Sequence, residues 1–167
     1  GGEFRGSGWF RFSKTKAECE AQTSVEGRIS QSIDLESPIL SFGNHAMVND
    51  GYMLSLYDLS QGPGVQMFRN ILLSSPDHRG ATGPLLFPID LALEFVGREK
   101  LTVAAGTFDA LRFRYADIPD LPEGYPEYDL WCTDDGDYVL LKAVVGGYMQ
   151  TRYELTEYAV TTAGARP

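Results

Sequence analysis

The sequence predicts a mainly β protein, in which a strongly curved antiparallel sheet or half-open β-barrel has one helix packed at or into its open side. In the run 97–115, GREKLTVAAGTFDALRFRY, apolar residues recur at every second position, as in a strand with one buried face. Turn-forming Gly, Pro and Asp-Gly signals separate similar runs along most of the chain. One stretch, residues 44–60, instead has helical periodicity. About eight to ten short strands and one helix favour a sheet that curls on itself, with the helix as plug or lid.

Length and composition predict one globular domain and argue against a transmembrane segment and against nucleic acid as a partner. The 167 residues are 43% hydrophobic and 22% charged, and no run approaches the roughly 18 apolar residues of a membrane helix, so we expect a soluble domain without a transmembrane segment. The chain shows no basic start followed by an apolar segment, so a signal peptide is either absent or already removed. A net charge of -9 argues against nucleic acid as a partner.

The N-terminal part, residues 1–36, is predicted to be strands. The run FRGSGWFRFS reads as an entry strand, and Gly27 lies between two alternating runs that form a hairpin. The helix follows over 44–60, with Asn44 as its N-cap and a Gly-Pro-Gly stop at 62–64. Its predicted apolar stripe consists of Val48, Tyr52, Leu56 and Leu59.

The main run of strands is predicted over 64–158, followed by a frayed tail at 159–167. Residues 104–107 read as a tight connection, because Gly106 tolerates a positive φ, which makes 97–115 a hairpin. Asp134 to Gly136 is a hairpin turn of the Asp-Gly type. We find no internal repeat and no linker dividing the chain.

The C-terminal half resembles a known family. The core KLTVAAGTFDALRFR, then YDLWCTDDGDYVLLKA, then TRYELTEY is similar to the uncharacterised DUF3108 proteins, relatives of the LolA- and LolB-type lipoprotein carriers, over roughly Leu85 to Tyr158. The family usually has Pro where this chain has Ala104 or Ala105. The resemblance implies a half-open barrel around helical or loop segments, with an apolar cavity for an acyl chain or similar ligand. It also implies an exported, periplasmic protein, although the chain shows neither a lipobox nor a signal.

Any histidine chemistry rests on His45 and His78, the two histidines of the chain. His45 begins the predicted helix, where Asp50 lies about 140° around the axis, so a base at His45 would need a strand carboxylate such as Asp90. His78 lies in the loop triplet Asp77-His78-Arg79, which offers an acid, a titrating group and an anion clamp if the loop closes over the barrel mouth. The alternatives are a capping histidine and a solvated loop.

Neither histidine has ligand spacing for a metal, and no nucleotide-binding motif is present, so we expect no metal and no cofactor. The thiols Cys19 and Cys132 read as packed side chains, with a disulfide left open.

Arginines and aromatic residues are the candidate ligand contacts. Arg112 and Arg114 have the parity opposite to Phe113, so they face solvent in an open sheet or line the lumen of a barrel and pair with a ligand carboxylate or phosphate. The 9 Phe, 9 Tyr and 2 Trp mostly fill the core, yet some can form a wall for an aromatic or lipidic ligand. The predicted ligand-binding residues are Tyr52, Arg112, Arg114, Trp131, Tyr148 and Arg152.

Two functions follow from these patterns. The first is a domain that binds a hydrophobic or amphipathic small molecule, lipid-like or aromatic, with the helix as gate. The alternative is a cofactor-free lyase, isomerase or hydrolase that works in the same cavity, with a Tyr or Arg to polarise the substrate. Its acid–base residues would be His45 or His78 with Asp50, Asp77 or Asp90. A third possibility is an interaction module, and sheet edges allow a monomer or a homodimer.

Overall fold

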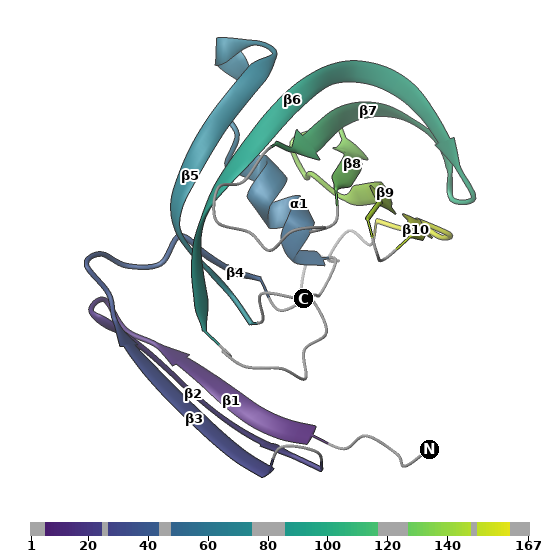
Figure 1. Ribbon diagram of the computed structural model, residues 1–167. Helices are drawn as coiled ribbons and strands as arrows, with labels where there is room; N and C mark the ends of the chain where they lie inside the picture. The colour runs from purple at the N-terminus through teal and green to yellow at the C-terminus, as the bar shows by residue number, and fades with distance from the viewer. Residues whose placement is uncertain are drawn as a thin grey trace, which may run out of the picture.

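Two β-sheets and one short α-helix make up the part of the chain that a computed structural model describes, which is residues 6–24, 27–43, 48–74, 86–116, 127–147 and 150–160 (Figure 1). The sheets have the orders β1-β2-β3 and β10-β9-β8-β7-β6-β5-β4. The elements are β1 (Gly6–Phe12), β2 (Lys16–Thr23), β3 (Gly27–Asp34), β4 (Ser41–Gly43), α1 (Val48–Ser55), a 3-10 turn (Leu59–Gln61), β5 (Gly64–Leu73), β6 (Phe87–Val103), β7 (Gly106–Tyr115), β8 (Tyr128–Thr133), β9 (Leu140–Val145) and β10 (Thr151–Glu154). The predicted fold class, a curled β-sheet with one helix, is confirmed.

The three-stranded sheet packs on one end of the larger one. Its β2–β3 hairpin turns at Gly27, which has φ +73°, as the sequence predicts. Ala17 and Cys19 of β2 pack in one core cluster with Leu72 of β5 and with Leu86, which immediately precedes β6. The Gln31 side chain joins the two sheets by polar contacts in the same region, as its amide donates to the Leu86 carbonyl at 3.0 Å and accepts from the Leu86 N–H at 2.9 Å.

One edge of the seven-stranded sheet differs from the predicted antiparallel arrangement. Strands β5 to β10 are antiparallel to their neighbours, but β4 pairs with β5 in parallel. The chain between β4 and β5 contains α1 and is therefore long enough to cross back to the edge of the sheet where β4 begins. A parallel pair of strands requires such a crossover connection.

Three β-bulges bend the seven-stranded sheet. The register shifts between Phe95 and Gly97 in β6, between Phe68 and Ile71 in β5, and at Leu141 in β9, where one extra residue enters the pairing with β8. Bulged strands bend and twist more strongly than regular ones. The 17-residue strand β6 therefore arches over the helix with β7 beside it, as Figure 1 shows.

The helix α1 fills the inner side of this curl. Its Leu54 and the following Tyr57 belong to the main core cluster, with side chains from β6, β7, β8 and β9. Phe113 at the centre of that cluster is fully buried, and its ring lies 5.5 Å from Tyr57 and 5.2 Å from Phe95. Edge-to-face and tilted ring pairs at this spacing are favourable. Met53 packs separately against Ile71 and Leu91.

The helix is shorter than predicted, and its buried face is displaced. It ends at Ser55 rather than near residue 60, and a 3-10 turn capped by the Asp58 side chain follows. The predicted N-cap, Asn44, lies outside the described residues. Met53, Leu54 and Tyr57 are buried. Of the predicted stripe, Leu56 and Leu59 are partly buried against the core, whereas Tyr52 is 52% exposed. The 3.6-residue period holds, but the choice of face depends on which side of the helix can approach the sheet closely.

The hairpin of β6 and β7 is confirmed. Val103 pairs with Gly106 across a turn of two alanines, and Gly106 has φ +137°. The Ala105 N–H donates to the Leu155 carbonyl at 3.0 Å, so the chain after β10 is bonded to the tip of the hairpin. Both cysteines are free and buried, which confirms that they are packed thiols.

Gly51 permits a close approach of α1 to the connection between β8 and β9, which leads to a stability prediction. A Cβ atom on Gly51 would lie 2.7 Å from the Tyr138 carbonyl oxygen. Gly→Ala in a helix normally stabilises by up to about 1 kcal/mol. We expect Gly51→Ala to destabilise instead, by about 1–3 kcal/mol, in urea unfolding. A matched variant, Gly146→Ala, meets ordinary contacts at 3.7 Å and is expected to change stability by less than about 1 kcal/mol. A stabilised Gly51→Ala would contradict this account of the helix position.

Candidate functional site

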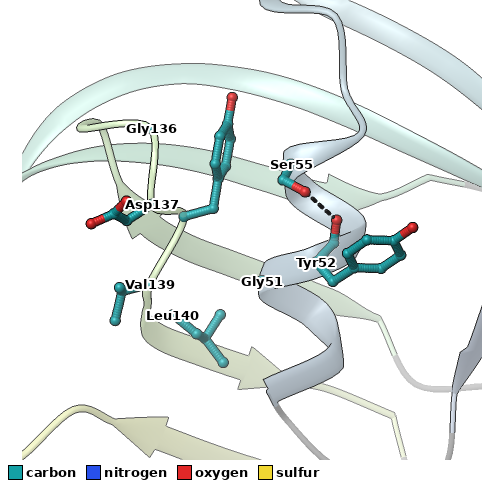
Figure 2. A pocket seen from close by; sticks show the side chains of 8 residues that line it. Gly51, Tyr52, Ser55, Gly136, Asp137, Val139 and Leu140 are labelled. Carbon is teal, nitrogen blue, oxygen red and sulfur yellow. Dashed lines mark hydrogen bonds between the residues drawn. The ribbon is translucent and has the colours of Figure 1, made fainter.

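A pocket lies between α1 and the connection from β8 to β9. Its volume is about 690 Å³, within the usual range for small-molecule sites. The helix supplies one wall, and the connection with the start of β9 supplies the other (Figure 2). The lining residues are Gly51, Tyr52, Ser55, Gly136, Asp137, Tyr138, Val139 and Leu140. Figure 2 also shows the Ser55 hydroxyl donating to the Tyr52 carbonyl at 2.7 Å, a bond within the helix wall.

The second wall is held in shape by the buried side chain of Thr133. Its hydroxyl donates to the Asp135 carboxylate at 2.6 Å and accepts from the Val139 N–H at 3.1 Å. The same Asp135 oxygen accepts from the Asp137 N–H at 3.0 Å, and Gly136 between them has φ +89°. These bonds confirm that a turn stands at Asp134 to Gly136, although the connection is longer than a two-residue hairpin loop. The wall is therefore organised before any ligand arrives.

Tyr138 is held in a conformation that bulky residues rarely adopt. Its φ is +52°, in the left-handed region, where a non-glycine residue costs about 1–2 kcal/mol. Its carbonyl is the group that approaches Gly51, so the strained residue stands where the turn meets the helix. Burial, followed by the nearby Cys132 and Asp134, raises the pKa of Tyr138, so its phenol stays neutral at physiological pH.

Asp50 lies on the sheet-facing side of α1, next to the pocket residue Gly51. The Tyr115 hydroxyl of β7 donates to its carboxylate at 2.8 Å. Burial raises the pKa of Asp50 from 3.8 to about 6, while the hydrogen bond from Tyr115 acts in the opposite direction. A carboxyl with such a pKa can hold or release a proton near neutral pH. Asp50 itself does not line the pocket.

The opposite face of the sheet carries a layer of ion pairs. Arg112 donates to Asp129 from Nε at 3.1 Å and from an Nη at 2.8 Å, and Arg114 reaches the same carboxylate at 3.2 Å. Arg112 and Lys142 cover the Trp131 ring at 5.0 and 4.6 Å from its centroid. The Trp131 indole N–H donates to Glu99. These groups have protein partners in the structure, so each has a structural role there.

The structure brings few of the predicted site residues together. Tyr52 lines the pocket, and Asp50 lies two residues before it on α1. Three other predicted residues lie on the other face of the sheet, in the ion-pair layer, namely Arg112, Arg114 and Trp131. Arg152 on β10 pairs with Glu154. His45, His78 and Tyr148 lie outside the described residues. The predicted roles of these residues in binding and catalysis stay predictions.

Sequence reasoning did not single out Gly51, Asp137 or Leu140 as site residues. Two signals pointed to the region, namely a glycine inside a helical pattern and an Asp-Gly turn between strands. Neither signal indicates that the helix and the turn meet, because that contact follows from the curl of the sheet.

Cys132 is not available as a nucleophile. Burial, and then the Asp134 and Asp135 carboxylates, raise the pKa of its thiol to about 12. In the described ranges, no group of three or more His, Cys, Asp and Glu side chains is placed to hold a metal ion.

The chain matches no protein-family profile, no curated protein and no solved structure. No helix within the described part of the chain is long and apolar enough to cross a membrane.

Asp50 should make the stability of the protein depend on pH. Because its pKa is higher in the folded state than in the unfolded chain, the folded state binds more protons between about pH 4 and 6, and this contribution to stability falls as pH rises through that window. The full shift corresponds to at most about 3 kcal/mol. We expect Asp50→Asn to keep the bond from Tyr115 and to lose this decline, measured by urea unfolding at pH 4.5 and 7.5.

Asp90→Asn is the matched control, since Asp90 is exposed and its ion pair with Arg69 is long, at 3.8 Å. The free energy of unfolding of Asp90→Asn should change between the two pH values by the same amount as that of the unmodified protein. Equal pH dependence in Asp50→Asn and Asp90→Asn would contradict a buried, proton-binding Asp50.

Proposed function

We propose that this protein binds a hydrophobic or amphipathic small molecule in the pocket between α1 and the β8–β9 connection. The observation that carries the proposal is the pocket of about 690 Å³, which combines the side chains of Tyr52, Tyr138, Val139 and Leu140 with few polar groups. Apolar and aromatic walls with a small number of placed polar groups are typical of small-molecule sites.

The preformed turn supports the same proposal. Thr133 and Asp135 fix the backbone beside the pocket, and Tyr138 is kept in a strained conformation there. Strained residues cluster at ligand clamps and switch regions, which makes Tyr138 a candidate contact for the ligand. A fixed wall also lowers the entropy lost on binding.

The helix is the wall that the core holds in place, since its Leu54 is fully buried in the main core cluster. On its sheet side, Asp50 is bonded to Tyr115, and just beyond its C-terminal end the Tyr57 hydroxyl lies 3.1 Å from the Gly62 carbonyl and 2.9 Å from the Gly64 carbonyl. These bonds and the burial of Met53 and Leu54 hold the eight-residue helix against the sheet, so the ligand enters beside the helix rather than by displacing it. A carrier that admits its ligand beside α1 is therefore the form of the proposal that we favour.

The resemblance to DUF3108 proteins and LolA-type carriers points in the same direction. Membership of that superfamily, an acyl-chain ligand and an exported location are parts of the proposal. The curled sheet around one helix is compatible with them, and the pocket offers a place for an alkyl chain.

A cofactor-free enzyme is the second candidate, and one observation favours it. Asp50 has a pKa of about 6 and is bonded to a tyrosine hydroxyl, a pair that can exchange a proton with a substrate. For this function the substrate must reach Asp50 past Gly51. The enzyme hypothesis is tested by incubating the protein with an amphiphile that binds and following the ligand by NMR. New product resonances that are absent with Asp50→Asn would support an enzyme, and an unchanged ligand would contradict it.

Removal of the Tyr52 ring should weaken ligand binding. Tyr52→Ala deletes an exposed side chain of the pocket wall, so the fold should tolerate it. With dodecyl maltoside below its critical micelle concentration, we expect calorimetric titration to show binding that is about five- to thirtyfold weaker in this variant, as the loss of about 1–2 kcal/mol of contact predicts.

Two variants control for this result. Tyr153→Ala removes another exposed tyrosine, on β10 and outside the pocket lining, and should leave the affinity unchanged. Arg112→Gln changes the ion-pair layer on the opposite face and should also bind normally. If Arg112→Gln loses binding while Tyr52→Ala keeps it, the ligand occupies the other face of the sheet and the proposed pocket is wrong.

A further inference from the structure

The charge around the pocket narrows the class of ligand. Among the eight lining residues, Asp137 carries the one formal charge, and its carboxylate has no hydrogen bond or ion pair within the described residues. Its N–H is used by the turn, but the side chain is exposed. An unpaired carboxylate at the rim of an apolar pocket attracts a cation and repels an anion.

Neighbouring charges do not cancel this effect. Arg98, the cation recorded at this turn, is occupied by Asp134 at 2.8 Å. Asp135 is engaged by Thr133 and by the turn backbone, and it adds further negative charge. On the helix side, α1 contains no Lys or Arg, and its one carboxylate, Asp50, accepts a hydrogen bond from Tyr115. The formal charge that lines the pocket is therefore that of Asp137, and Arg98 does not neutralise it because it is paired with Asp134.

The pocket also offers aromatic faces beside that carboxylate. Tyr52 and Tyr138 both line it, and the rings of tyrosines attract ammonium groups through their negative π-faces. Val139 and Leu140 provide the apolar surface for a hydrocarbon body. A carboxylate, two tyrosines and two aliphatic side chains together suit a molecule with an alkyl or ring body and a cationic head.

We propose that the ligand is a cationic amphiphile whose ammonium head lies at Asp137 and whose apolar body lies against Tyr138 and Leu140. The inference rests on the proposed binding function and gives the chemical class of its ligand. We expect fatty acids and other anionic lipids to bind weakly, because the Asp137 carboxylate would repel their negatively charged head groups.

Three ligands with the same dodecyl chain test the inference: dodecylammonium, dodecyl maltoside and dodecanoate, titrated calorimetrically below their critical micelle concentrations at low ionic strength. We expect dodecylammonium to bind at least about tenfold more tightly than dodecanoate, with the neutral maltoside between them. The reason is that the Asp137 carboxylate attracts the ammonium group and repels the carboxylate of dodecanoate, and both interactions are screened by water and salt. In Asp137→Asn the ratio of dodecylammonium to dodecanoate affinity should fall below about threefold.

Asp34→Asn is the matched control, since it removes one negative charge from an exposed position on β3 and should leave the ratio intact. Dodecanoate binding as tightly as dodecylammonium would overturn the charge inference but leave the binding function standing. A preference for dodecylammonium that persists unchanged in Asp137→Asn would also overturn it. If none of the three ligands binds, both the inference and the proposed function fail.

Discussion

The packing of α1 against the inner side of the curled sheet is the interaction on which the rest of the structure depends. Leu54 and Tyr57 join the helix to the main core, and Gly51 lets its backbone approach the Tyr138 carbonyl. Without the helix, Phe95, Phe113 and Leu130 would expose a continuous apolar surface to water. The same contact brings the helix beside the β8–β9 connection, so the core and the pocket share one cause.

The bulges explain why a sheet of this size can wrap around a single short helix. Asn70, with φ +60°, stands in the bulge of β5, and Gly97 stands in that of β6. Both residue types tolerate unusual backbone angles, so the bends occur where the chain permits them. A flat sheet would leave α1 in contact with only its nearest strands, whereas the bent one places side chains of β6 and β9 in the same cluster.

The sequence predicted the class of fold well, because alternation and turn residues are local signals. The hairpins at Gly27 and Gly106 and the Asp-Gly turn follow from short-range rules. Short-range rules do not predict which face of the helix is buried, since Tyr52 and Leu54 are both apolar enough to fill a core. The choice between them depends on the close approach at Gly51, a contact between elements almost ninety positions apart in the chain. The pocket was beyond prediction for the same reason, and the parallel β4–β5 pair also depends on tertiary arrangement.

The central claim is that an amphiphile binds between α1 and the β8–β9 connection, and a crystal structure of the complex with dodecylammonium tests it most directly. The account predicts density for the alkyl chain between Tyr52 and Leu140, with the ammonium nitrogen within about 4 Å of an Asp137 oxygen, an ion-pair distance. Density on the opposite face beside Trp131 and Arg112, with an empty pocket, would contradict it.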